Sequence, residues 1–208
     1  MKLSNMTLFY APAACSLAPH IALREAGAGF TLEKVDLQTK KTETGADFTG
    51  VNPNGYVPAL QLESGQVLTE VTAIVQYIAD TFPGSRLAPP AGTAGRYKLL
   101  EWLGFISSEL HRNLAGMFNP ALTPELKASV MALLTKRLDW LARQLEGKIY
   151  LLDTGFTVAD GYLFTVLNWS NFVGLDLAPW KAIQDYMARV GSRPSVVAAL
   201  KDEGLVPA

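Results

Sequence analysis

A short segment rich in proline and glycine divides this sequence into two stretches of different pattern, and this division limits the fold more than any other feature. Residues 83–95 read PGSRLAPPAGTAG, with three prolines and three glycines, a composition typical of a linker. Before this segment strand and helix patterns alternate, whereas after it every pattern is helical. A chain of 208 residues is long enough for two small domains. We therefore predict an α/β domain over 1–82, a linker over 83–95 and an all-helical domain over 96–208.

The first stretch predicts the element order β-α-β-β-β-α, which corresponds to a four-stranded mixed sheet covered by helices. Strand patterns, which are short and rich in apolar or alternating residues, cover 6–10, 30–35, 59–62 and 66–68. Apolar residues at helical spacing cover 15–26 and 72–82. Gly27 is placed to end the first of these helices.

The second stretch predicts helices throughout. One helix covers 97–115, and another begins at Thr123-Pro124 and ends at Gly147. Thr157 and Asp160 have the spacing of a capping box at the start of a helix that reaches residue 172. Shorter helices are predicted over 179–190 and 194–201.

Charge and composition exclude several functional classes. The chain has 18 basic and 19 acidic residues in no long block, which argues against a nucleic-acid partner and against a polybasic membrane surface. No apolar run reaches the roughly 20 residues that cross a bilayer. Two histidines and one cysteine are few for a structural metal site, so we predict no metal. A lone cysteine favours a reducing compartment, and we predict a cytoplasmic protein.

Cys15 lies in the stretch FYAPAACSLAP, between a strand and a helix pattern, and three hypotheses compete for it. The run AAC at 13–15, with Lys2 ahead of it, resembles a lipoprotein cleavage site, but the apolar stretch 8–14 is short and contains Pro12. A second hypothesis is that the cysteine packs as a small hydrophobic residue. The third is that the start of the helix lowers the pKa of the thiol and makes it reactive, because helix N-termini stabilise anions. The residues alone leave the last two open.

Two further features suggest a binding cleft. Val57-Pro58 follows a sharp turn and enters a strand, which fits either a cis bond or a trans proline at an edge strand. On the helix over 97–115, small or polar residues recur at steps of four, three and four, namely Gly104, Ser108, His111 and Ala115. This stripe fits the wall of a cleft into which His111 donates a hydrogen bond, and a surface histidine fits the pattern equally well.

Taken together, these features resemble the cytosolic glutathione transferases, and among them the bacterial beta class. The resemblance covers nearly the whole chain and depends on the stretches FYAPAACSLAPHIALRE (9–25), VNPNGYVPAL (51–60), LTEVTAIVQYIAD (68–80), RYKLLEWLGFISSELH (96–111) and FTVADGYLFTVLNW (156–169). It implies a thioredoxin-like, glutathione-binding first domain, a helical second domain with the electrophile site, and a homodimer. It also implies a detoxifying enzyme that conjugates glutathione, its co-substrate, to hydrophobic electrophiles, with no tightly bound cofactor.

The resemblance assigns roles to single residues. Cys15 and His111 are the implied catalytic pair beside the glutathione sulfur, and Pro58 is the implied cis-proline. Lys40 serves the glycyl end of glutathione, the backbone of Val57 serves its cysteinyl part, and Glu70 with Val71 serves its γ-glutamyl end. The full set of implied glutathione contacts is Tyr10, Lys40, Tyr56, Val57, Glu70, Val71 and Ser108.

Two departures from the family's pattern bear on glutathione affinity and substrate choice. Related sequences often have asparagine where Gly104 stands and glutamine where Tyr56 stands. Two alternative functions also stay open. One is exchange of glutathione disulfides through Cys15, and the other is a non-catalytic ligand-binding or interaction protein with the same fold.

Overall fold

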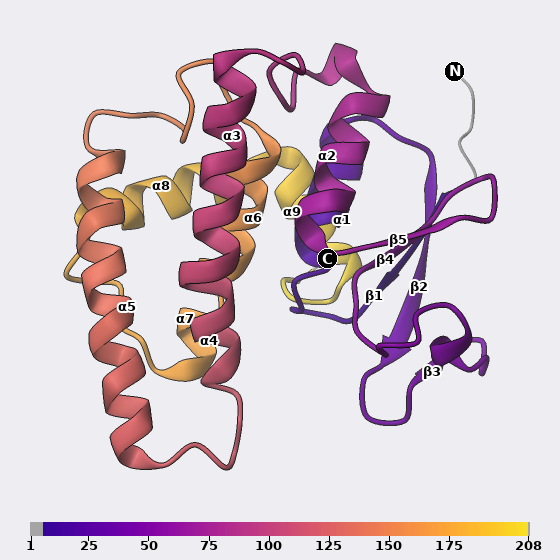
Figure 1. The fold of residues 1–208 in the computed structure, drawn as a ribbon, viewed down its shortest axis with the longest axis horizontal. Coiled ribbons are helices and arrows are strands. Elements are labelled where there is room, and N and C mark those ends of the chain that lie inside the picture. The colour runs from indigo at the N-terminus through magenta and orange to yellow at the C-terminus, as the bar shows by residue number, and fades with distance from the viewer. Residues whose placement is uncertain (1–5, 208) are drawn as a thin grey trace. The chain divides into compact units, whose positions relative to one another are not determined.

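A computed structural model describes residues 6–207, and this part of the chain forms two compact units whose elements are labelled in Figure 1. The first unit contains the described residues up to Ala88 together with those from Arg193 onward, and the second is Pro89–Ser192. Lys2, the basic residue ahead of the possible lipoprotein cleavage site, lies outside the described residues. No helix in residues 6–207 is long and apolar enough to cross a membrane.

The first unit is built on a five-stranded sheet with the strand order β3-β2-β1-β4-β5 (Figure 1). β1 and β2 run parallel, whereas β4 pairs antiparallel with both β1 and β5. Parallel neighbours need a crossover connection, which the helix between β1 and β2 supplies. The strands are β1 (Met6–Tyr10), β2 (Phe30–Asp36), β3 (Lys41–Thr42), β4 (Ala59–Gln61) and β5 (Val67–Thr69).

The sequence predicts β1, β2, β4 and β5 close to their observed bounds but misses β3. This strand has only two residues and pairs antiparallel with the end of β2, where Val35 lies opposite Thr42. Lys41-Thr42 has neither the length nor the alternation that signals a strand. The observed sheet therefore has one more strand than the predicted one, at its β2 edge.

Helices α1 (Leu17–Glu25), α2 (Val71–Thr81) and α9 (Pro194–Asp202) belong to the first unit, with 3-10 turns η1 (Phe48–Gly50) and η2 (Pro83–Ser85). α1 buries every residue from Leu17 to Leu23, and the chain turns away at Gly27 as predicted. The φ of Gly27 is 63°, a left-handed value that glycine adopts without strain and that ends many helices.

The position of α9 differs from the predicted domain division, which assigns all of 96–208 to the helical domain. α9 packs against α1, with Val196 and Ala199 fully buried. Arg193 also binds Glu25 of α1, with 2.6 Å between Nε and Oε1. An amphipathic pattern predicts that a segment is helical, but it does not identify the surface against which that helix packs.

The second unit is helical, and two of its helices begin at the predicted caps. The Thr123 hydroxyl accepts a hydrogen bond from the Leu126 N–H at 3.3 Å, and the Thr157 N–H donates to Asp160 Oδ2 at 2.8 Å. The elements are α3 (Ala94–Phe105), η3 (Ile106–His111), α4 (Arg112–Gly116), α5 (Pro124–Leu145), α6 (Val158–Leu167), α7 (Ser170–Val173) and α8 (Lys181–Gly191).

Two predicted helices are interrupted in the structure. The helix predicted over 97–115 contains a π-helical segment, η3, between α3 and α4. The helix predicted over 157–172 ends at Leu167, and α7 starts only at Ser170. Apolar spacing alone does not reveal a change in the number of residues per turn. π-helical segments often occur at functional sites, and η3 ends at the candidate residue His111.

Candidate active site

Three segments of the first unit meet at one end of its sheet, and they carry three of the predicted site residues. Phe9 of β1 lies opposite Ala59 of β4, and Ala59 lies opposite Thr69 of β5. The segment after β1 therefore lies beside the segments before β4 and after β5. These segments hold Cys15, Val57 and Glu70 respectively.

Cys15 lies on the loop before α1, with its thiol directed at the turn before β4. The thiol donates to the carbonyl oxygen of Val57, with 3.3 Å between Sγ and that oxygen. The side chain is half-buried, and its neighbour Ala14 packs against the apolar cluster that includes Val57. The structure thus brings together two residues that stand far apart in the sequence and that the resemblance assigns to one site.

Burial raises the pKa of the Cys15 thiol to about 12. An apolar surrounding disfavours the thiolate, and the carboxylate of Glu70 adds to this effect. The backbone N–H groups of Cys15 and Ser16 act in the opposite direction but are outweighed. The prediction that the helix start lowers this pKa is therefore wrong. At neutral pH the side chain is a thiol, which can donate a hydrogen bond.

Asn52 fixes the turn before β4. Its side chain donates to the carbonyl oxygen of Tyr56 at 2.7 Å and accepts from the Asn54 N–H at 3.2 Å. The bond between Val57 and Pro58 is cis, as the resemblance implies. Sequence reasoning misses Asn52, although the motif NPNG contains the signal, because asparagine side chains commonly stabilise a turn through the backbone two residues on.

Lys40 is held against the same turn. Its Nζ donates to the Gly55 carbonyl oxygen at 3.0 Å and lies 5.6 Å from the centroid of the Tyr56 ring. Gly55 has a φ of 64°, and a Cβ there would lie 3.2 Å from the Lys40 side chain, so both the backbone conformation and the close approach of Lys40 favour glycine. Tyr56 is 71% exposed. Because an ammonium has three donors, Lys40 keeps donors for a carboxylate of a ligand.

Glu70 and Val71 form the start of α2. Glu70 is exposed and has a φ of 67°, which is uncommon for a residue other than glycine and occurs often at binding sites. Within the described residues, the backbone N–H groups of Val71 and Thr72 have no acceptor. Unpaired N–H groups at the start of a helix bind carboxylates and other anions.

Tyr10 is a predicted glutathione contact that the structure places in the interior. It is 8% exposed, and its ring centroid lies 6.4 Å from that of His20. Burial raises the pKa of its phenol, and the carboxylates of Glu43, Glu203 and Asp202 raise it further. This surrounding is that of a packing residue, with little of the ring open to a ligand.

His111 ends the segment η3 in the second unit, and two aromatic residues hold its ring. Nδ1 lies 2.6 Å from the hydroxyl oxygen of Tyr162. The ring centroids of His111 and Trp169 are 5.0 Å apart, and the rings are inclined at 74°. Burial lowers the pKa of His111, so the neutral imidazole predominates at pH 7. The sequence contains no signal for either aromatic partner.

Gly104 and Ser108, the other site positions on this part of the chain, are both exposed. A Cβ at Gly104 would meet nothing within 4 Å, so packing does not require glycine there. The predicted stripe assumes α-helical steps from Gly104 to Ala115. Because η3 has wider turns, those steps do not place the residues in one line along the helix. The prediction of a single straight stripe is therefore wrong.

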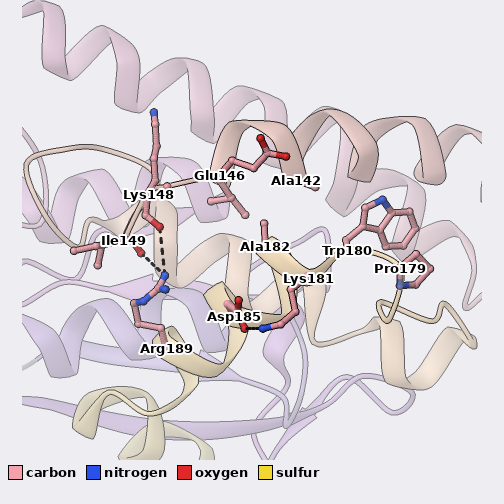
Figure 2. Close-up of a pocket in the computed structure, with 12 residues that line it drawn as sticks. Ala142, Glu146, Lys148, Ile149, Pro179, Trp180, Lys181, Ala182, Asp185 and Arg189 are labelled. Carbon is pink, nitrogen blue, oxygen red and sulfur yellow. Dashed lines mark hydrogen bonds and ion pairs between the residues drawn. The ribbon is translucent and has the colours of Figure 1, made fainter.

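A hollow of about 760 Å³ opens in the second unit between the end of α5 and the start of α8 (Figure 2). Its charged side chains largely have protein partners, since Arg189 donates to the Ile149 carbonyl oxygen at 3.0 Å and Lys181 pairs with Asp185. His111 does not line it. The hollow is therefore separate from the candidate residues of this unit. Across residues 6–207, no three His, Cys, Asp or Glu side chains are grouped to hold a metal ion.

Comparison with known proteins places this geometry in a family. Residues 14–81 match the family described as glutathione S-transferase, N-terminal domain, and residues 105–194 match glutathione S-transferase, C-terminal domain. The glutathione S-transferase GstA of Escherichia coli O157:H7 is 46% identical over 200 residues, which cover 96% of this chain and 100% of that protein.

Two solved structures extend the match to the fold. A sphingomonad glutathione S-transferase complexed with glutathione is 48% identical, with a TM-score of 0.92, and covers 96% of this chain and 100% of its own. A bacterial beta class glutathione S-transferase of Sphingomonas chungbukensis is also 48% identical, with a TM-score of 0.93 and the same coverage. The chain belongs to the glutathione S-transferase family and is an enzyme of its bacterial beta class.

Proposed function

We propose that this glutathione transferase joins the thiol of glutathione to hydrophobic electrophiles and that its first unit holds the tripeptide. The observation that carries the proposal is the set of unpaired backbone donors and charged groups around Cys15. The N–H group of Val57 has no acceptor within the described residues, although Val57 is only 8% exposed. A buried N–H group is rarely left unpaired, and the cysteinyl backbone of glutathione supplies an acceptor here.

The two ends of glutathione find partners on either side of this central contact. The tripeptide has two carboxylates and one ammonium group. The unpaired N–H groups at the start of α2 bind the γ-glutamyl carboxylate, and Glu70 pairs with the ammonium group. Lys40, fixed at Gly55 by one hydrogen bond, uses its remaining donors for the glycyl carboxylate.

The reaction requires the thiolate of glutathione, because the thiolate is the nucleophile. We assign two neutral donors to this sulfur, and the single proton of Cys15, which the Val57 carbonyl oxygen accepts in this structure, turns to the sulfur when glutathione binds. Cys15 remains a thiol because its pKa is raised to about 12, and His111 remains a neutral imidazole because burial lowers its pKa. Donors aimed at the site of negative charge stabilise the thiolate. A neutral Cys15 also does not compete with glutathione for the electrophile.

The alternative activity, disulfide exchange through Cys15, is disfavoured by the same observation. Because its pKa is raised to about 12, Cys15 is almost entirely un-ionised at pH 7. Exchange begins with attack by a thiolate, so this activity would be slow at neutral pH and would rise steeply as the solution becomes more alkaline.

We further propose that the electrophile binds to the helical unit and that the enzyme is a cytoplasmic homodimer. Tyr97 and Leu100 of α3 are 65% and 36% exposed, and exposed apolar side chains of this kind suit a surface covered by a second copy. A lone cysteine suits a reducing compartment. The nearly balanced charge, 18 basic against 19 acidic residues, gives no reason to propose a nucleic-acid partner.

Variants of Cys15 test the assigned chemistry. Cys15→Ser should keep most of the conjugation rate with a chromogenic aryl halide, because a hydroxyl also donates a hydrogen bond. Cys15→Ala should lose about tenfold, or about 1.4 kcal/mol, the value of one hydrogen bond. Both variants should remain bound to glutathione-agarose. Equal rates in all three proteins would contradict the role of Cys15, and a wild-type protein that neither binds nor conjugates glutathione would contradict the proposed function.

A further inference from the structure

We infer that Tyr162 is a positioning residue for His111: its hydroxyl donates to Nδ1 and thereby keeps the imidazole proton on Nε2. This inference rests on the proposed function, in which His111 donates a hydrogen bond to the glutathione sulfur. A neutral imidazole has one donor nitrogen and one acceptor nitrogen. If the proton is on Nε2, then Nδ1 can accept the hydrogen bond from the Tyr162 hydroxyl while Nε2 donates to a ligand. The other tautomer cannot do both.

The geometry fixes the ring as well as the hydrogen bond. The hydroxyl oxygen of Tyr162 lies 2.6 Å from Nδ1, and the two rings meet edge to face at 84°. Trp169 contacts the imidazole at a centroid distance of 5.0 Å, and Phe118 in turn packs edge-on against Trp169. With two aromatic rings against it, the imidazole of His111 has little freedom to change its rotamer.

Tyr162 is itself held firmly. It is 1% exposed and lies in the first turns of α6, two residues after Asp160 of the capping box. The carboxylate of Asp160 accepts from the Thr157 N–H at 2.8 Å and from the Leu151 N–H at 2.9 Å. The capping box therefore fixes the start of α6, and through it the position of the Tyr162 hydroxyl.

The other ring nitrogen of His111 is available to a ligand. In residues 6–207 Nε2 has no hydrogen-bond partner. Every buried side-chain nitrogen and oxygen in this part of the chain does have a partner. Nε2 must therefore reach solvent, although the residue is half-buried. The neighbouring carboxylate on η3, Glu109, binds Arg137 at 2.5 Å, so it is not the acceptor that selects the tautomer of His111.

The chain has only two histidines, His20 and His111, which makes a direct test possible. In the full-length protein labelled with ¹⁵N-histidine, NMR at neutral pH separates protonated from unprotonated ring nitrogens by their chemical shifts. Loss of one set of signals in His111→Gln assigns the spectrum. We expect His111 of the wild type to show an unprotonated Nδ1 and a protonated Nε2. A protonated Nδ1 would overturn the inference whether or not the protein is active, so this result is distinct from a failure of the proposed function.

Tyr162→Phe keeps the ring and removes only the hydroxyl. We expect the two nitrogen shifts of His111 to move toward each other, because both tautomers become populated. The kcat for conjugation should fall about three- to tenfold, the effect of one hydrogen bond, with the KM for glutathione unchanged. The matched control Tyr77→Phe, which removes the hydroxyl of a half-buried tyrosine on α2, should change neither the His111 nitrogen shifts nor the kcat. Unchanged His111 shifts in Tyr162→Phe would overturn the inference, and should this variant not fold, the wild-type spectrum alone decides.

Discussion

Glu203, close to the C-terminal end of the chain, should anchor the loop that carries Cys15. Its Oε2 accepts from the Ala13 N–H at 3.1 Å, and its Oε1 lies 3.0 Å from Nδ1 of His20. Glu203 is 5% exposed and His20 is fully buried, so water cannot easily replace the contact between them. Glu203→Ala would remove this acceptor from the half-buried Ala13 N–H and from the buried His20 ring. We expect the variant to be destabilised and to lose activity.

The contacts set the size of the effect. A hydrogen bond to a charged group contributes about 1.5–3 kcal/mol, and Glu203 makes one such contact with Ala13 and one with His20. We therefore expect Glu203→Ala to lower the free energy of unfolding by about 3–5 kcal/mol. Glu203→Gln keeps the side-chain volume and one carbonyl oxygen, so it should lose roughly half as much. Urea unfolding at neutral pH measures both values.

The effect on activity follows from the conformation of Ala13. Its φ of 62° lies in the left-handed region, which is unfavourable for a residue with a Cβ. Without Glu203 the loop can relax, and Cys15 two residues later is displaced. Conjugation by folded Glu203→Ala should therefore fall. Glu25→Gln is the matched control, because Glu25 binds Arg193 across the same α1–α9 contact but does not contact the loop.

Two results would refute this reasoning. One is a Glu203→Ala protein within about 1 kcal/mol of the wild type in urea unfolding, since even one such hydrogen bond is worth more. The other is an equal loss of activity in Glu25→Gln, because the effect would then come from general loosening of α9. Glu25→Gln should lose stability and retain its conjugation rate while it is folded.

Further predictions concern affinity and assembly. Gly104→Asn should lower the KM for glutathione about two- to tenfold through one new hydrogen bond. The control Gly104→Ala stabilises the helix by about 1 kcal/mol but adds no amide group, so its KM should be unchanged. Equal KM values in the two variants would reject the contact. A Cβ at position 104 meets nothing within 4 Å, so both variants should fold. Light scattering at micromolar concentration should give twice the mass of the 22.5 kDa chain, and a monomer mass would count against the homodimer.

The features that the sequence predicts well are those determined within a few residues. Thr123 caps α5 through a contact three residues away, and Gly27 ends α1 through its own backbone conformation. The alternation of Phe30–Asp36 likewise predicts β2 directly. Such signals are readable because the residues that cause the structure are adjacent in the chain.

The supports of the candidate site are long-range and therefore escape the sequence. Ala13 and Glu203 are separated by 190 positions, and His111 and Tyr162 by 51. No local pattern pairs these residues, so motifs identify Cys15 and His111 but not the groups that orient them. The segment η3 is hidden for a related reason, because the apolar residues Leu99, Leu103, Ile106 and Leu110 keep helical spacing and are buried in the structure while the turn widens between them.

Cys15 shows that the position of a residue can be predicted correctly while the pKa inferred from that position is wrong. The residue does stand at the start of a helix, and the nearby backbone N–H groups do favour its thiolate. Burial outweighs them, however, and the thiol finds an acceptor in the Val57 carbonyl oxygen at 3.3 Å. A thiol held neutral in this way is a donor at the place where glutathione must become an anion. The same burial that makes Cys15 a poor nucleophile therefore preserves its proton, and the proposed conjugation requires this proton to turn from the Val57 carbonyl oxygen to the glutathione sulfur.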